Sequence, residues 1–179
     1  MTRIGLVSPR PNLVIDTNIL LLLLGYQCSQ FENLGAPARR RILEEIRGRG
    51  AVSPEWFDEL WLFFQNAAQS AVTQHVIAET YGLRNRLGAF RSRKDLVWRA
   101  ALEILRSPGI VEVSFQLEEL DDLPEYRKIL IEIGPTDTGL LYIAQQRKAV
   151  LLTEDGPLQH WASVRSIPWL TLNQLGLTS

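Results

Sequence analysis

The stretch Asn12-Leu13-Val14-Ile15-Asp16-Thr17-Asn18, with the apolar run of residues 19–24 behind it, decides the fold that we predict. Its first apolar residues show no polar alternation, which is typical of a strand covered on both faces in a parallel sheet. Asp16 ends this run, and a helix is expected directly after it. A carboxylate at the carboxyl end of a buried strand lies where open α/β sheets bind their ligands. Asp16 is also a good helix-capping residue, so a capping role and a functional role are both open at this point.

The pattern of an apolar strand followed by an acid recurs near the end of the chain, in Leu151-Leu152-Thr153-Glu154-Asp155. Strands and helices alternate along the rest of the sequence, which predicts an α/β fold with a parallel sheet covered by helices. Strands are expected at residues 13–15, 71–73, 110–115, 149–153 and 168–172. Helices are expected at residues 19–24 (ending at Gly25), 36–47, 53–64, 75–87, 94–105 and 118–133, at 136–144 with Thr136 as the cap, and at about 157–164.

Length, charge and cysteine usage bound the class of protein. The chain has 179 residues, 46% hydrophobic and 22% charged, which is typical of one globular domain. A formal net charge of −1 argues against indiscriminate coating of nucleic acid, although a local basic patch could still bind a polyanion. The single cysteine, Cys28, excludes an intramolecular disulfide and fits a reducing compartment. Residues 19–24 are too few to span a bilayer and no signal peptide precedes them, so we expect a soluble, cytoplasmic protein with no membrane partner.

Four carboxylates fall at strand ends or early in predicted helices: Asp16, Glu79, Asp137 and Asp155. Such positions can converge at one edge of a parallel sheet. Crowded carboxylates raise one another's pKa and destabilise a fold, whereas Mg²⁺ or Mn²⁺ prefers oxygen ligands. A single acid is more often exposed on the surface, but the joint pattern predicts a site for a hard divalent cation. No phosphate-binding glycine loop of the P-loop type occurs.

These motifs resemble the PIN-domain family of metal-dependent nucleases, which includes the ribonuclease toxins of the VapC type. The matches are Val14-Ile15-Asp16-Thr17-Asn18, His75-Val76-Ile77-Ala78-Glu79, Thr136-Asp137 with the helix to Ala144, and Leu151-Leu152-Thr153-Glu154-Asp155. The resemblance implies a three-layer fold in which a central twisted parallel sheet of about five strands lies between helices. It implies that Asp16, Glu79, Asp137 and Asp155 form the catalytic and metal site, with Thr17, Asn18 and Thr153 as helpers near metal, water or phosphate.

The activity that the resemblance implies is Mg²⁺- or Mn²⁺-dependent hydrolysis of RNA by an endoribonuclease. The enzyme could be the toxin of a toxin–antitoxin module, with an antitoxin protein as partner, or a stand-alone RNA-processing nuclease. An inactive PIN-like module that binds RNA or protein is the alternative of another class. The sequence leaves open whether one or two ions bind, and whether Asp137 or Glu79 orients the water. We expect one PIN-like domain over residues 1–179, with a helical elaboration at about 36–66 that makes it longer than compact toxins.

Two further segments carry predictions about partners. A basic segment follows Glu79 and would contact the RNA backbone, although a solvated helical face is an equal alternative. An aromatic helix at residues 56–64 either covers the core or contributes to a homodimer or antitoxin contact. The predicted RNA-binding residues are Arg84, Arg86, Arg91, Arg93 and Lys94, with Arg99 and Arg106 further along the same segment.

Overall fold

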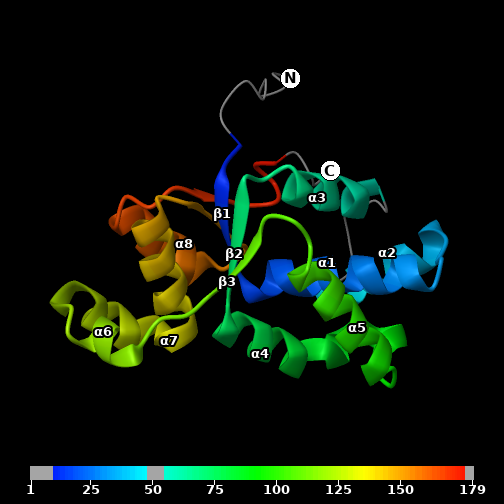
Figure 1. The fold of residues 1–179 in the computed structure, drawn as a ribbon, viewed down its shortest axis with the longest axis horizontal. Helices are drawn as coiled ribbons and strands as arrows, with labels where there is room; N and C mark the ends of the chain where they lie inside the picture. The colour runs from blue at the N-terminus through cyan, green and yellow to red at the C-terminus, as the bar shows by residue number, and fades with distance from the viewer. Residues whose placement is uncertain (1–9, 48–54, 176–179) are drawn as a thin grey trace.

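Five parallel strands form one sheet at the centre of the computed structural model, which describes residues 10–47 and 55–175. The strand order is β3-β2-β1-β4-β5, and every neighbouring pair is parallel. The predicted α/β fold with a five-stranded parallel sheet flanked by helices is therefore confirmed (Figure 1). The strands are β1 (Asn12–Ile15), β2 (Gln69–Thr73), β3 (Ile110–Val113), β4 (Val150–Leu152) and β5 (Trp169–Leu170).

The first strand, β1, lies in the middle of the sheet, and its residues 13–15 are buried, as the uninterrupted apolar run predicted for a strand covered on both faces. Leu13 pairs with Ser70 of β2 on one side and with Val150 of β4 on the other. Val14 and Ile15 are completely buried. Because all five strands run the same way, the residues that follow β1, β2 and β4 meet at one edge of the sheet.

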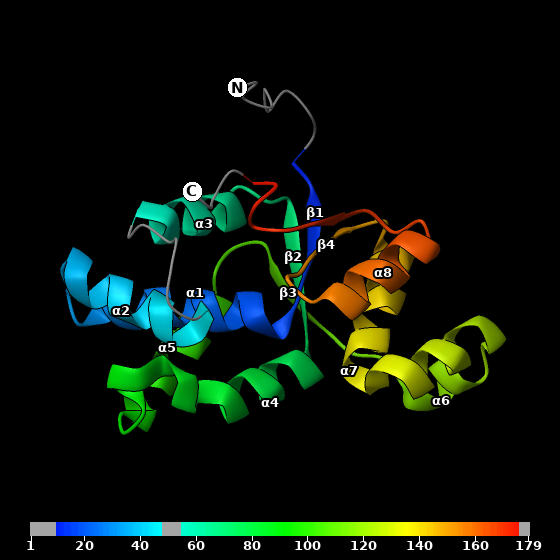
Figure 2. The ribbon, with the colours of Figure 1, turned by 180° about the vertical axis from the view of Figure 1, so that it is seen from behind.

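Helices cover both faces of the sheet (Figures 1 and 2). The long first helix and its neighbours lie on one side, and the last three helices lie on the other. Within the described part of the chain, no helix is long and apolar enough to cross a membrane. The helices are α1 (Thr17–Phe31), α2 (Ala36–Arg47), α3 (Glu55–Gln65), α4 (Gln74–Gly82), the 3₁₀ segment η1 (Leu83–Phe90), α5 (Lys94–Leu105), α6 (Leu117–Asp121), α7 (Pro124–Arg147) and α8 (Gly156–Val164).

The prediction that the first helix ends at Gly25 is wrong, because α1 continues to Phe31. Gly25 serves packing between helices. A Cβ atom at this position would lie 3.0 Å from Ile42 Cγ2 and 3.1 Å from Ile46 Cδ1 of α2. The glycine therefore lets α2 pack closely on α1, and a contact between helices overrides its usual meaning as a helix end.

The single helix predicted at residues 118–133 is also wrong, since α6 ends at Asp121 and α7 begins at Pro124. The physical reason is local, because proline favours the first turn of a new helix. The predicted break at Gly134 is confirmed, because its φ of 84° and ψ of 174° are not helical. Thr136 lies inside α7 rather than capping a new helix, and the hydroxyl that bonds to the break is that of Thr138, which donates to the Gly134 carbonyl at 2.7 Å.

Other predicted boundaries differ less. The helices at 36–47 and 94–105 match α2 and α5, whereas the helix at 75–87 is divided between α4 and η1. The strands β1 and β2 begin one and two residues earlier than predicted, and β3, β4 and β5 are shorter than predicted by one or two residues at an end. The start of the aromatic helix at residues 53–54 and the stop at residues 48–50 lie outside the described residues.

The aromatic helix α3 is mainly a cover for the core. Trp56, Phe57 and Phe64 are buried, and Trp61 is partly buried and stacks on Tyr26 of α1 with ring centroids 5.1 Å apart. The interpretation of α3 as core is therefore confirmed for most of its aromatic side chains. A homodimer or antitoxin contact at this helix stays a prediction.

Candidate functional site

Asp16 lies at the point where β1 becomes α1, and its carboxylate is already engaged. Oδ1 accepts from the backbone N–H of Asn18 at 3.3 Å, and Oδ2 accepts from the Thr153 hydroxyl at 2.6 Å. The residue is 3% exposed. Burial raises the pKa of Asp16 above its ordinary value, the two hydrogen bonds act in the opposite direction, and Asp155 raises it further. The capping role is thus present, and it holds a buried carboxylate at the edge of the sheet.

Thr153 connects the ends of β1 and β4. Its hydroxyl donates to Asp16 and accepts from the backbone N–H of Asp155 at 3.0 Å. Asp155 in turn caps α8, because Oδ1 accepts from the Leu158 N–H at 2.9 Å. One hydroxyl therefore connects two of the predicted acids, and Thr153 lies where a helper residue was expected.

Glu79 reaches the same edge from α4. Its Oε2 accepts from the Thr17 hydroxyl at 3.0 Å, across a separation of 62 residues in sequence. Thr17 is buried in the first turn of α1, whereas Glu79 is exposed. The hydrogen bond fixes Glu79 next to the residue that follows Asp16, which places the third acid at the carboxyl end of the sheet.

Asp137 completes the group from the other side of the sheet. It lies in α7, one turn after the break at Gly134, and is half-buried. Burial first, and then the negative charges of Asp16, Asp155 and Glu79, raise the pKa of Asp137 to about 7. Asp137 is thus close enough to the other three predicted acids to be affected by each of them, and we name this group of four the acidic edge.

The acidic edge is not a closed metal site in this conformation. Among the described residues, no group of three or more histidine, cysteine, aspartate or glutamate side chains is arranged to hold a metal ion. Repulsion between charges acts over longer distances than the bonds between a metal ion and its ligands. The acids can therefore affect the pKa of Asp137 without lying close enough together to hold an ion in this conformation. In donor chemistry the residues suit a hard divalent cation, because they offer only carboxylate and hydroxyl oxygens.

The predicted basic residues lie further along the chain and are not equivalent. Arg84 donates to the Tyr81 carbonyl at 2.8 Å and lies over the Tyr81 ring, and Arg93 forms an ion pair with Glu32 at 2.6 Å. Arg86, Arg91 and Lys94 are exposed. In Figures 1 and 2, α4 runs outward from the strand ends, and the chain then turns back through α5, which packs on α1. The basic segment therefore begins at the end of α4 that points away from the acidic edge.

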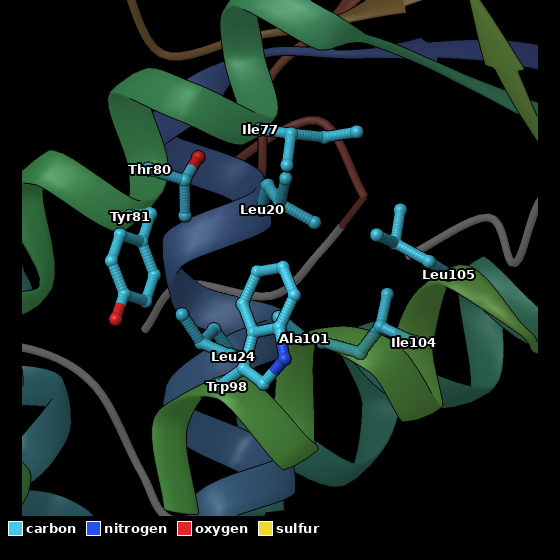
Figure 3. A pocket seen from close by; sticks show the side chains of 9 residues that line it. All are labelled: Leu20, Leu24, Ile77, Thr80, Tyr81, Trp98, Ala101, Ile104 and Leu105. Carbon is cyan, nitrogen blue, oxygen red and sulfur yellow. The ribbon is translucent and has the colours of Figure 1, made fainter. Parts of the chain in front are cut away.

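An apolar pocket lies between α1, α4 and α5, on the side of these helices shown in Figure 3. Leu20 and Leu24 form its floor, and Ile77, Tyr81 and Trp98 stand around it. Trp98 is 48% exposed and packs edge-on against Tyr81. None of the four acids lines this pocket, so it is separate from the acidic edge.

Sequence reasoning missed a pair of charged residues beside the acidic edge. Glu154, between Thr153 and Asp155, forms an ion pair with Arg47 at the end of α2, with 2.8 Å between Oε2 and Nη2. Its other oxygen, Oε1, accepts from the Leu172 N–H at 2.7 Å. The neighbouring acids could have drawn attention to Glu154, but no local pattern indicates its partner, because 107 residues separate the two.

The fold and the acidic edge define an α/β protein with carboxylates grouped at the carboxyl end of a parallel sheet. Neither a scan against models of protein families nor a search of curated proteins found a match to this chain.

Proposed function

We propose that this protein is a PIN-like endoribonuclease that depends on Mg²⁺ or Mn²⁺ and hydrolyses RNA phosphodiester bonds. The observation that carries the proposal is the group of four acids at the end of the parallel strands. Asp137 is affected there by the charges of Asp16, Asp155 and Glu79. A fold gains nothing from crowding like charges, so a site for a cation explains the arrangement better than packing does.

The four acids would hold the cation between them. When bound, the ion would lower the pKa of a water molecule and stabilise the charge that develops on the phosphate. The hydroxyl of Thr153 orients Asp16 and receives the Asp155 N–H, and the hydroxyl of Thr17 orients Glu79. The Asp155 carboxylate accepts from the Leu158 N–H, so hydrogen bonds fix three of the four carboxylates before any ligand arrives. This lowers the reorganisation that binding requires.

Asp137 differs from the other three acids, because within the described part of the chain no hydrogen bond orients its carboxylate. Its pKa of about 7 means that this side chain resists ionisation up to neutral pH. A bound cation would lower the pKa of Asp137 again, because its positive charge would balance the negative charges of the four carboxylates. We therefore propose that the three hydrogen-bonded acids form a fixed part of the site. The Asp137 side chain would then move to complete the set of ligands when a cation binds.

RNA is the substrate that we propose, with the exposed side chains of Arg86, Arg91 and Lys94 as contacts to phosphates outside the scissile bond. Charged residues without an interleaved aromatic motif bind the backbone rather than read bases. Nothing in the described residues favours a toxin over a stand-alone processing enzyme, so the proposal is the activity that both share. A small neighbouring gene for a DNA-binding antitoxin would favour the toxin.

The test is incubation of the purified protein with single-stranded and structured RNAs, with Mg²⁺ or Mn²⁺ and with EDTA. We expect internal cleavage that EDTA stops and that added Mn²⁺ restores. Cleavage that continues in excess chelator contradicts the metal mechanism. RNA binding without cleavage under every metal condition favours the inactive binding module.

A further inference from the structure

The turn at residues 153–155 is held from two directions. Thr153 and Asp155 bond toward the acidic edge, whereas Glu154 bonds away from it to Arg47 and to the Leu172 backbone. The two oxygens of one carboxylate therefore connect the end of β4 to the end of α2 and to the segment after β5.

Arg47 is itself held in place. Its guanidinium lies over the ring of Trp56, 5.5 Å from the centroid, and Trp56 is only 2% exposed. The side chains of Arg47 and Glu154 are 23% and 22% exposed, so the pair is shielded from solvent more than an ordinary surface ion pair. A charge-assisted hydrogen bond in such a position fixes geometry as well as contributing attraction.

We propose that Arg47 and Glu154 are a positioning pair that sets the direction of the Asp155 carboxylate. This inference rests on the proposed function, in which Asp155 is one of the residues that hold the cation. It also gives a role to the helices at 36–66: α2 supplies Arg47, and α3 supplies the ring on which Arg47 rests. Residues outside a metal's ligand set that orient its ligands typically change metal affinity 10- to 100-fold when they are removed.

The sign of the effect separates positioning from simple electrostatics. Replacing Arg47 by Met removes a positive charge near the acids, so electrostatics alone predicts tighter binding of a divalent cation. Positioning predicts weaker binding, because the turn that carries Asp155 loses its outer contact. Arg40→Met is the matched control, since Arg40 lies on the same helix and its ion pair with Glu44 is exposed.

The first measurement needs no metal. Amide hydrogen exchange should become about tenfold faster at the Asp155 and Leu158 N–H groups in Arg47→Met, because both bond within this turn. Amides of β1 should exchange at the wild-type rate. No change in exchange at the turn overturns the inference. Equal acceleration throughout the sheet also overturns it, because it indicates global destabilisation and not a local loss of order at the turn.

The second measurement is the dissociation constant for Mn²⁺, obtained by electron paramagnetic resonance. We expect a value about tenfold higher for Arg47→Met, a smaller increase for Arg47→Lys, and no change for Arg40→Met. Tighter or unchanged Mn²⁺ binding in Arg47→Met overturns the inference. A wild-type protein that binds Mn²⁺ but cleaves no RNA refutes the nuclease proposal, while these two comparisons still decide the role of the pair.

Discussion

Replacing Asp137 by Asn should stabilise the metal-free protein, although Asp137 belongs to the proposed site. Its pKa in the folded chain is raised from 3.8 to about 7, by burial first and then by three neighbouring acids. A group with a raised folded pKa binds more protons in the folded state than in the unfolded state. The contribution of Asp137 to the free energy of unfolding is therefore most favourable below about pH 4, and this stability is lost as the pH rises toward 7.

The magnitude follows from the same change. Without solvent screening, a rise in pKa from 3.8 to about 7 corresponds to about 4 kcal/mol in the free energy of unfolding. Solvent screening at this half-buried side chain reduces it to about 2 kcal/mol. For a chain of this length, that is an increase of about 4–8 °C in melting temperature.

The assay is thermal unfolding followed by circular dichroism in EDTA, at pH 4.5 and at pH 8. Asp137→Asn should melt about 4–8 °C above wild type at pH 8, and within about 2 °C of it at pH 4.5. Glu103→Gln removes one charge from an exposed position on α5 and should change stability by less than about 0.5 kcal/mol. A melting temperature of Asp137→Asn at or below that of wild type at pH 8, or an equal difference at both pH values, would show that Asp137 does not destabilise the metal-free protein through its charge.

Three further outcomes follow from the structure. Mn²⁺ at a hundredfold excess over its dissociation constant should stabilise wild type by about 2.7 kcal/mol, measured by thermal unfolding. The Asp155→Asn change should reduce this stabilisation, and an equal stabilisation of the variant would show that Asp155 is not part of the site. The double change Arg86→Ala and Arg91→Ala should reduce the slope of log binding constant against log salt concentration by about one unit per lost phosphate contact, measured by fluorescence anisotropy with RNA. An unchanged slope would assign both arginines to a solvated face that does not contact RNA. Gly25→Ala should destabilise by about 1–3 kcal/mol in urea unfolding, because its new Cβ meets α2 at 3.0 Å, whereas Gly82→Ala, with no neighbour within 4 Å, should be neutral or stabilising; equal effects would contradict the packing role of Gly25.

The parts of the fold that were predictable are those whose signals are local. The apolar run before Asp16 is enough to indicate a strand buried on both faces, and the apolar stripe on α2 indicates the bounds of that helix. Gly25 misleads because the same residue type serves a helix end and a close contact between helices, and the partner helix that decides between them is not visible locally. Pro124, by contrast, is a local signal for the start of a helix, so the division between α6 and α7 was predictable in principle.

The site divides in the same way. Asp16 and Asp155 could be found from the ends of apolar strands, and both are at the acidic edge. The raised pKa of Asp137 depends on its burial and on the charges of three acids from other elements, which sequence spacing does not report. The ion pair between Arg47 and Glu154 was not predictable, because it depends on how α2 packs against the end of β4.

We propose that the acidic edge carries out metal-dependent cleavage of RNA. This proposal is tested most directly by the single-turnover rate of cleavage of an end-labelled RNA, measured over a titration with Mn²⁺ for wild type, Asp137→Asn and Glu103→Gln. We expect a rate that rises to saturation with Mn²⁺ for wild type and Glu103→Gln. We expect a loss of at least about a hundredfold for Asp137→Asn, the size typical when a group that acts in the transition state is removed. Asp137→Asn cleaving at the wild-type rate over the same titration would contradict the proposal.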